Sequence, residues 1–235
     1  MTALVVTVTP LGLKCAFKDV LTDFGSVFAC LGEEVVPPTP CDANSTINEE
    51  LIIANPEDIP EGKTEEDLEY LYVKDLNVTD FPRRLGKKFW KLKGIEFDGC
   101  NIGELRSSFF EGLDFLMSVK LPKNKLKKLP GRLFRWNFNI RWIEFGGNAE
   151  LKNVGFNLFK HLRWLRKVDF SSGGCGDSSV AELVGGDTSV FNGLAQLLWK
   201  DCPADPEDMA KDMESMVCEF DNSKGGSKES GSSGN

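Results

Sequence analysis

One pattern of apolar residues occurs five times between Leu68 and Cys175, at an almost constant spacing. Each copy places apolar side chains at its first, fourth and sixth positions, and three copies place Asn or Cys at the ninth. The copies begin at Leu68, Leu92, Leu116, Ile140 and Leu165, so the period is 24 residues, with one extra residue in the fourth copy. A repeat of this length kept in register indicates a solenoid in which each copy forms one turn.

Apolar and polar residues alternate within each copy, as Leu71 and Val73 show in the first. This alternation predicts a short β-strand with one buried face, and stacked copies would form a parallel sheet. We expect the side chains of Asn124 and Asn148 to satisfy backbone groups of neighbouring turns. Cys100 is a smaller substitute at the same position.

The second half of each copy also keeps its register, and we expect its apolar residues to point inward from short helices or irregular turns. These residues are Leu85, Phe109, Leu133 and Leu158. The third copy departs from the pattern, because Asn137 stands where the other copies have Phe89, Leu113 and Leu162. We expect Trp136 or Phe138 to fill that space instead.

The pattern L-x-x-L-x-L-x-x-N/C-x-L is the signature of the leucine-rich repeat. From about Leu13 to Pro203, the chain also resembles the secreted leucine-rich-repeat proteins of arthropods, especially those of flies and midges. The features that carry this resemblance are Cys15 and Cys30, Gly62-Lys63-Thr64 before Asp67-Leu68, the turns Phe81-Pro82 and Leu129-Pro130, and Cys202-Pro203. The resemblance implies a binding protein of the extracellular fluid, in some members linked to innate immunity.

We therefore predict an α/β fold: a right-handed, curved leucine-rich-repeat solenoid with a parallel β-sheet on its concave face, disulfide-stapled caps and a C-terminal helix. The expected divisions are an N-terminal cap (1–46), repeats (47–175), a C-terminal cap (176–203), an amphipathic helix (204–220) and a disordered tail (221–235). Within the first cap, a hairpin from Leu11 to Cys30 should cover the end of the first repeat.

The predicted C-terminal helix starts at Asp205-Pro206 and carries an apolar face. That face consists of Met209, Met213, Met216 and Phe220. It should pack on the C-terminal cap or, as the alternative, meet another chain. In that second case Cys218 could bridge two copies, which would make the protein a homo-oligomer.

Seven cysteines are more than a cytosolic protein of 235 residues usually has. We predict the disulfides Cys15–Cys30 and Cys175–Cys202, with reduced buried thiols as the alternative. No partner is predicted for the remaining cysteines, Cys41, Cys100 and Cys218.

Two sequons, at Asn44 and Asn77, are predicted glycosylation sites and agree with secretion. No apolar run is long enough to cross a bilayer, so we predict a secreted, extracellular protein without a membrane span. The apolar stretch Ala3–Val6 is interpreted as the first strand of the mature protein or as the remnant of a signal peptide.

No group of residues predicts catalysis. His161 is the only histidine, lies beside Lys160 and is expected to be a solvated surface residue. The cysteines lack the spacing of metal ligands. We therefore predict no enzyme, no metal and no cofactor.

The predicted binding site lies on the concave face of the sheet, where the polar residues of the strands alternate with the buried ones. Its candidates are Tyr70, Tyr72, Glu96, Asp98, Lys120, Lys123, Trp142, Glu144, Lys167 and Asp169. Tyrosine and tryptophan are the side chains that most often anchor an interface. The alternative is that Glu96, Lys120 and Glu144, on neighbouring strands, simply pair with one another.

The net charge of −8 is unevenly distributed. Residues 32–69 contain twelve acidic side chains and one basic one, whereas residues 115–143 contain eight basic side chains and no acidic one. We predict a protein or glycan ligand. The alternative is a structural, self-assembling protein in which acidic caps meet the basic belt of a neighbouring copy. Nucleic acid is not expected, because the chain is acidic overall.

Overall fold

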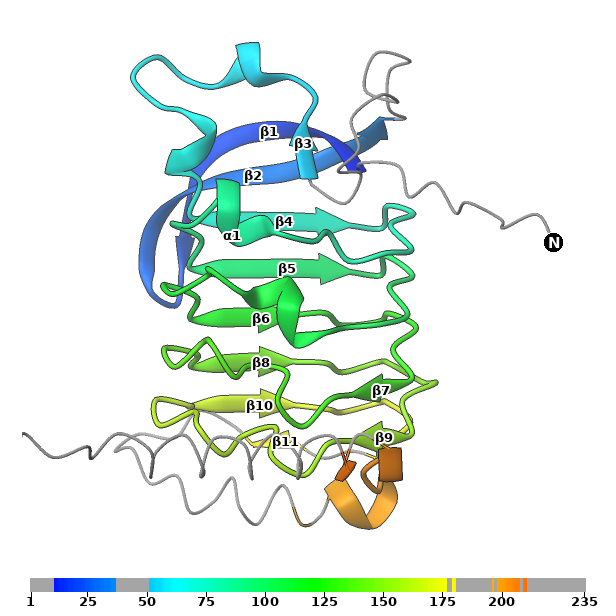
Figure 1. Cartoon of the computed structure of the whole chain (residues 1–235). Coiled ribbons are helices and arrows are strands. Elements are labelled where there is room, and N and C mark those ends of the chain that lie inside the picture. Colours follow the sequence, from blue (N-terminus) through cyan, green and yellow to red (C-terminus); the bar gives the residue numbers. More distant parts are fainter. Residues whose placement is uncertain are drawn as a thin grey trace, which may run out of the picture.

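The computed structural model describes residues 11–36, 51–176, 179–180, 196, 198–207 and 209–210. Its main element is a nine-stranded sheet with the order β11-β10-β8-β6-β5-β4-β2-β1-β3. Five strands are parallel and stack one turn on the next (Figure 1): β4 (Tyr70–Lys74), β5 (Gly94–Asp98), β6 (Ser118–Lys120), β8 (Trp142–Glu144) and β10 (Lys167–Asp169). The fold is a β-solenoid of about four turns with little helix.

The pairing of these strands matches the register of the sequence repeat. Leu71 pairs with Ile95, and Ile143 pairs with Val168, as the equivalent positions require. The prediction of a parallel sheet is therefore confirmed, including the extra residue of the fourth copy. That residue lies between Asn148 and Asn153, because on the far side of the core Asn153 pairs with Lys128, 25 residues earlier.

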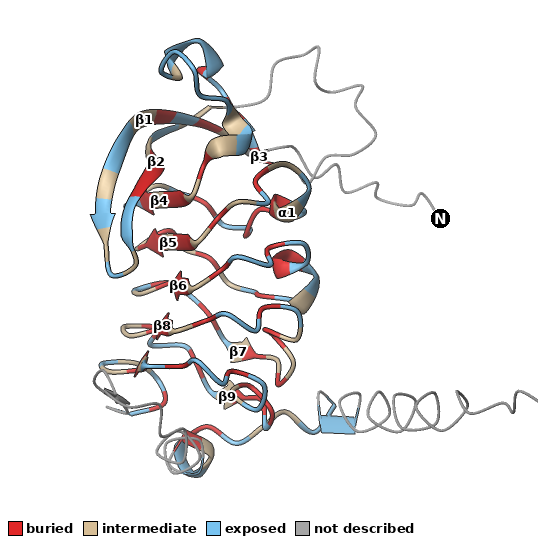
Figure 2. Ribbon diagram, turned by 90° about the vertical axis from the view of Figure 1, so that its left-hand side faces the viewer, coloured by how far each residue is buried: buried red, intermediate tan, exposed pale blue. Residues whose placement is uncertain are grey.

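The chain returns on the opposite side of the core from the main sheet (Figure 2). This side contains the short helix α1 (Leu85–Lys88), the 3-10 helix η4 (Ser107–Phe110) and a small parallel pair, β7 (Lys128–Leu129) and β9 (Asn153–Val154). The inward positions predicted for the return segments are all buried, namely Leu85, Phe109, Leu133 and Leu158. Two further 3-10 helices, η2 (Pro56–Asp58) and η3 (Glu65–Asp67), precede β4.

Buried asparagines link the turns as expected. The side-chain oxygen of Asn124 accepts hydrogen bonds from the backbone N–H groups of Cys100 (3.1 Å) and Ile102 (3.0 Å), and its amide nitrogen donates to the carbonyl of Phe97 (2.7 Å). Asn148 makes equivalent bonds one turn further on. Each side chain thus satisfies buried backbone groups that no strand partner reaches.

Asn137 corrects one expectation. Trp136 and Phe138 do not fill the space in the third turn, because both side chains are exposed. Asn137 itself is buried there and donates hydrogen bonds to the carbonyls of Phe110 (2.9 Å) and Leu113 (3.0 Å). A polar residue can occupy the core at this position because the preceding turn supplies acceptors for its amide.

A long antiparallel hairpin closes the N-terminal end of the solenoid. Its strands are β1 (Leu11–Thr22) and β2 (Gly25–Val36), and the disulfide Cys15–Cys30 joins them. β2 pairs in parallel with β4, and β3 (Leu51–Ile53) pairs in parallel with β1. The hairpin extends beyond the predicted end at Cys30. Its tip curls over the outer face of the sheet, by which we mean the side that points away from the core (Figure 2).

The C-terminal end carries the second predicted disulfide, Cys175–Cys202, and a short strand β11 (Ser179–Val180) that pairs antiparallel with β10. The two disulfides indicate an oxidising compartment. Among the described residues, no helix has the length and apolar character needed to cross a membrane. Several predicted features lie outside the described residues: Cys41, Asn44, Met213, Met216, Cys218, Phe220 and the tail 221–235.

Candidate binding pocket beneath the hairpin tip

The outer face of the sheet carries two columns of side chains, one residue from each turn. The first column is Tyr70, Gly94, Ser118, Trp142 and Lys167. The second is Tyr72, Glu96, Lys120, Glu144 and Asp169. Most of the predicted binding residues therefore share one face, as the alternation along the strands indicated.

Phe24 at the hairpin tip packs into a gap in the first column. The gap exists because small residues, Gly94 and Ser118, stand between Tyr70 and Trp142. The ring of Phe24 lies 6.2 Å from that of Tyr70 and 5.9 Å from that of Trp142, centroid to centroid. A β-carbon at Gly94 would lie only 2.3 Å from the Tyr70 ring, so only glycine leaves room for this arrangement.

This packing corrects the prediction that the aromatic residues of the sheet are open to a partner. Tyr70 is 8% exposed and Trp142 only 3%, so both are buried, whereas Tyr72 remains partly exposed. The sequence contained a signal for this cover. The turn residues Thr22-Asp23-Phe24-Gly25 lie well beyond Cys15, so a hairpin built on the Cys15–Cys30 disulfide must overhang the first turn.

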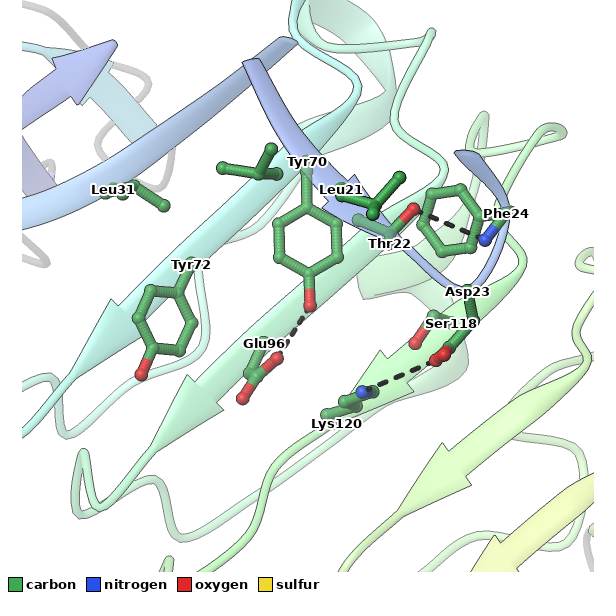
Figure 3. Close-up of a pocket in the computed structure, with 11 residues that line it drawn as sticks. Leu21, Thr22, Asp23, Phe24, Leu31, Tyr70, Tyr72, Glu96, Ser118 and Lys120 are labelled. Atoms are coloured by element: carbon green, nitrogen blue, oxygen red, sulfur yellow. Dashed lines mark hydrogen bonds and ion pairs between the residues drawn. The ribbon is translucent and has the colours of Figure 1, made fainter. Parts of the chain in front are cut away.

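A pocket of about 540 Å³ remains between the hairpin and the outer face (Figure 3). The sheet provides its floor through Tyr70, Tyr72, Glu96, Ser118 and Lys120. The hairpin provides its wall through Leu31 and residues 20–24, of which Leu21 is 87% exposed. Sequence reasoning found four of the floor residues but missed Ser118 and the wall.

Hydrogen bonds and ion pairs hold the polar groups of the pocket in place. The Tyr70 hydroxyl donates a 2.6 Å hydrogen bond to Glu96, and burial, together with the charge of Glu96, raises the pKa of Tyr70. The ammonium group of Lys120 lies 4.0 Å from the carboxylate of Asp23 and 3.7 Å from that of Glu144. The hydroxyl of Ser118 is buried and has no hydrogen-bond partner among the described residues.

The other predicted residues lie outside the pocket. Lys167 forms a 2.8 Å ion pair with Glu144, and this hydrogen bond is the main reason that the pKa of Lys167 is raised. Lys123 lies 3.5 Å from Asp98, and Asp169 accepts a hydrogen bond from a neighbouring backbone N–H. The alternative prediction, that charged side chains on neighbouring strands pair with one another, holds for Lys120 and Glu144. Glu96, in contrast, is bound by Tyr70.

Neither histidine nor cysteine lines this pocket. His161 is exposed and lies on a different surface, in the loop between β9 and β10. Among the described residues, no group of three or more His, Cys, Asp or Glu side chains could hold a metal ion. Among the described residues, Cys100 is the cysteine that forms no disulfide, and burial raises the pKa of its thiol.

The fold and the pocket together define a disulfide-linked β-solenoid with a ligand-sized hollow on its outer face. The sequence matches no protein-family model, and a search of curated proteins finds no significant match.

Proposed function

We propose that the chain is a secreted leucine-rich-repeat protein that binds an extracellular ligand in the pocket beneath its hairpin. The leucine-rich-repeat assignment rests on the 24-residue register and on the bonds that Asn124 and Asn148 make to neighbouring turns. The extracellular assignment rests on the two disulfides and on the resemblance to secreted arthropod proteins. Asn77, within its sequon, is exposed and accessible to glycosylation.

The observation that carries the proposed function is the exposed apolar wall above a polar floor. Leu21 projects from the hairpin almost wholly into solvent, and Glu96 and Lys120 present charges of opposite sign below it. A ligand that enters the pocket can bury this apolar side chain and gain free energy from the contact. We propose a protein segment rather than a glycan here, because Val20 and Leu31 continue the apolar wall.

The ion pairs within the chain support ligand binding over the alternative function, which is self-assembly through acidic caps and a basic belt. Four lysines of the basic belt lie within 4.0 Å of a carboxylate of the same chain, which leaves less charge for a neighbouring copy. They are Lys120, Lys123, Lys127 and Lys128. Sedimentation at low and high salt distinguishes the two functions, since only the assembling protein should associate in a salt-sensitive way.

The test is capture of a partner from the extracellular fluid of the source organism, followed by a measurement of Kd with the purified partner. The double variant Leu21→Ser/Tyr72→Ala removes one side chain from the wall of the pocket and one from its floor. Neither side chain is buried. We expect Kd to rise at least about tenfold, or about 1.4 kcal/mol. Trp142 is a poor choice for substitution, because it is buried.

Ile52→Ser is the matched control, since Ile52 is an exposed apolar residue on β3, away from the pocket. This variant should bind as the unmodified protein does. Equal capture by the pocket variant and the control, at unchanged thermal stability, would contradict the proposed site.

A further inference from the structure

Exposed aromatic side chains gather along one edge of the solenoid. Six aromatic side chains are exposed in the described part of the chain, and five of them lie in the loops that enter β5, β6, β8 and β10. These five, which we call the aromatic strip, are Trp90, Phe115, Trp136, Phe138 and Trp164. The loops follow the left-hand edge in Figure 1, where the strand arrows begin, and Figure 2 faces that edge. Exposed apolar side chains that gather on one surface are typical of an interaction site.

Each turn of the strip contains a pair of adjacent residues, one aromatic and one polar. The two residues lie directly before the first apolar residue of each repeat. The pairs are Trp90-Lys91, Asp114-Phe115, Phe138-Asn139 and Arg163-Trp164. Neighbouring strands lie about 4.8 Å apart, so the rings of these pairs follow one another from turn to turn, and Trp136 adds a second ring to the third turn. In the first two turns they are in contact, with ring centroids 6.0 Å apart.

Two hollows lie between the rings of the strip. The first, of about 300 Å³, is bounded by Trp136 and Phe138 and contains Asp114. The second, of about 290 Å³, is bounded by Phe138 and Trp164 and contains Arg163. Phe138 thus separates two similar hollows, and each offers an aromatic wall beside a planar hydrogen-bonding group.

We propose that the aromatic strip binds a linear, neutral glycan laid along the axis of the solenoid. One face of a sugar ring consists of C–H groups, which pack on an aromatic ring. Its hydroxyl groups bond to the carboxylate, amide and guanidinium groups beside the rings. Sugars follow one another along an extended glycan as the rings follow one another along the strip, so neighbouring sugars can contact neighbouring rings.

Other partners fit the strip less well. An anionic lipid surface would meet Glu111 and Asp114 in the first hollow, and their charges oppose the attraction of Lys160 and Arg163 in the second. An apolar protein surface would bury the charged groups of Asp114 and Arg163 beside the rings, which costs free energy. A glycan offers C–H faces to the aromatic residue of each pair and hydroxyl groups to the polar one.

The test is titration of the full chain with cellohexaose, laminarihexaose and chitohexaose, followed by tryptophan fluorescence and calorimetry. We expect at least one hexasaccharide to bind, and to bind at least tenfold more tightly than its disaccharide, because the longer chain spans more turns. Phe138→Ala and Trp164→Ala should each weaken binding about tenfold or more. Both side chains are exposed, so both variants should fold.

Phe156→Ala is the matched control, because Phe156 is equally exposed but packs on Trp199, outside the strip. It should leave glycan binding unchanged, as should Leu21→Ser in the hairpin pocket. The proposal is overturned if no hexasaccharide binds, if binding is independent of chain length, or if Phe138→Ala and Trp164→Ala bind normally. It is equally overturned if the strip binds anionic vesicles and no hexasaccharide.

Discussion

The ring of Phe24 lies 5.9 Å from the ring of Trp142 on β8, although Phe24 is in the turn before β2, which joins the sheet beside β4. The hairpin tip therefore extends over β5 and β6 as far as β8, while Phe24 also contacts Tyr70 on β4. This contact fixes the height of the wall above the pocket, and it explains why Trp142 is buried. The pocket and the cap are consequently one structural unit.

The contact between Phe24 and Trp142 should contribute measurably to stability. Trp142→Ala should cost about 3 kcal/mol or more, because it empties a buried site. Phe24→Ala should cost less, because Phe24 is only partly buried. A double-mutant cycle measured by urea unfolding should give a coupling of about 0.5–1.5 kcal/mol between the two rings. A coupling of zero would mean that the tip does not rest on Trp142 in solution.

The buried asparagine Asn148 should be essential for the solenoid. Asn148→Ala removes three hydrogen bonds and leaves the N–H of Leu126 and the carbonyls of Leu121 and Phe145 with one partner fewer. We expect a loss of about 2–4 kcal/mol in the free energy of unfolding. Asn139→Ala is the control, since it removes one exposed bond and should cost less than about 1 kcal/mol. Similar losses in the two variants would refute the linking role of Asn148.

Tyr70 should make the protein sensitive to alkaline pH. Its pKa is raised by burial and by Glu96 in the folded chain, whereas in the unfolded chain it stays near about 10. Below pH 10 both states keep the proton, so Tyr70 adds no pH dependence. Above pH 10 only the unfolded chain releases the proton, so stability falls as the pH rises, by up to about 1.4 kcal/mol per pH unit.

Tyr70→Phe isolates this effect, because it keeps the ring and removes the proton. The variant should lose stability less steeply than the unmodified protein between pH 10 and pH 11.5 in urea unfolding. The ionisation of lysines affects both proteins alike and cancels in the difference. Parallel curves would show that Tyr70 titrates normally and that its hydroxyl is not held by Glu96.

Most of the fold could be predicted from the sequence. The spacing of apolar residues determined which residue of each turn faces the core, and so the register from Leu71 to Val168 could be derived residue by residue. The disulfides and the asparagine bonds followed from residue type and position. These features depend on contacts within one turn or between neighbouring turns, which a repeating pattern specifies directly.

The candidate site was only partly predictable. Alternation along a strand showed that Tyr70 and Trp142 lie on the outer face, but it did not show what covers that face. The cover comes from Phe24, a residue outside the repeat, and no periodic pattern relates Phe24 to β8. Asn137 was misjudged for a similar reason, because its acceptors are backbone carbonyls of the preceding turn.

A stack of parallel strands with a constant period could in principle continue from one molecule to the next, as in a fibre. In the described part of the chain, the sheet ends on one side in β3, with three residues, and on the other in β11, with two. Such short strands offer an incoming chain few free backbone groups. Because β3 pairs with Leu11–Leu13 of β1 and β11 pairs with Val168 and Asp169 of β10, each short end strand occupies backbone groups to which a further strand could otherwise add.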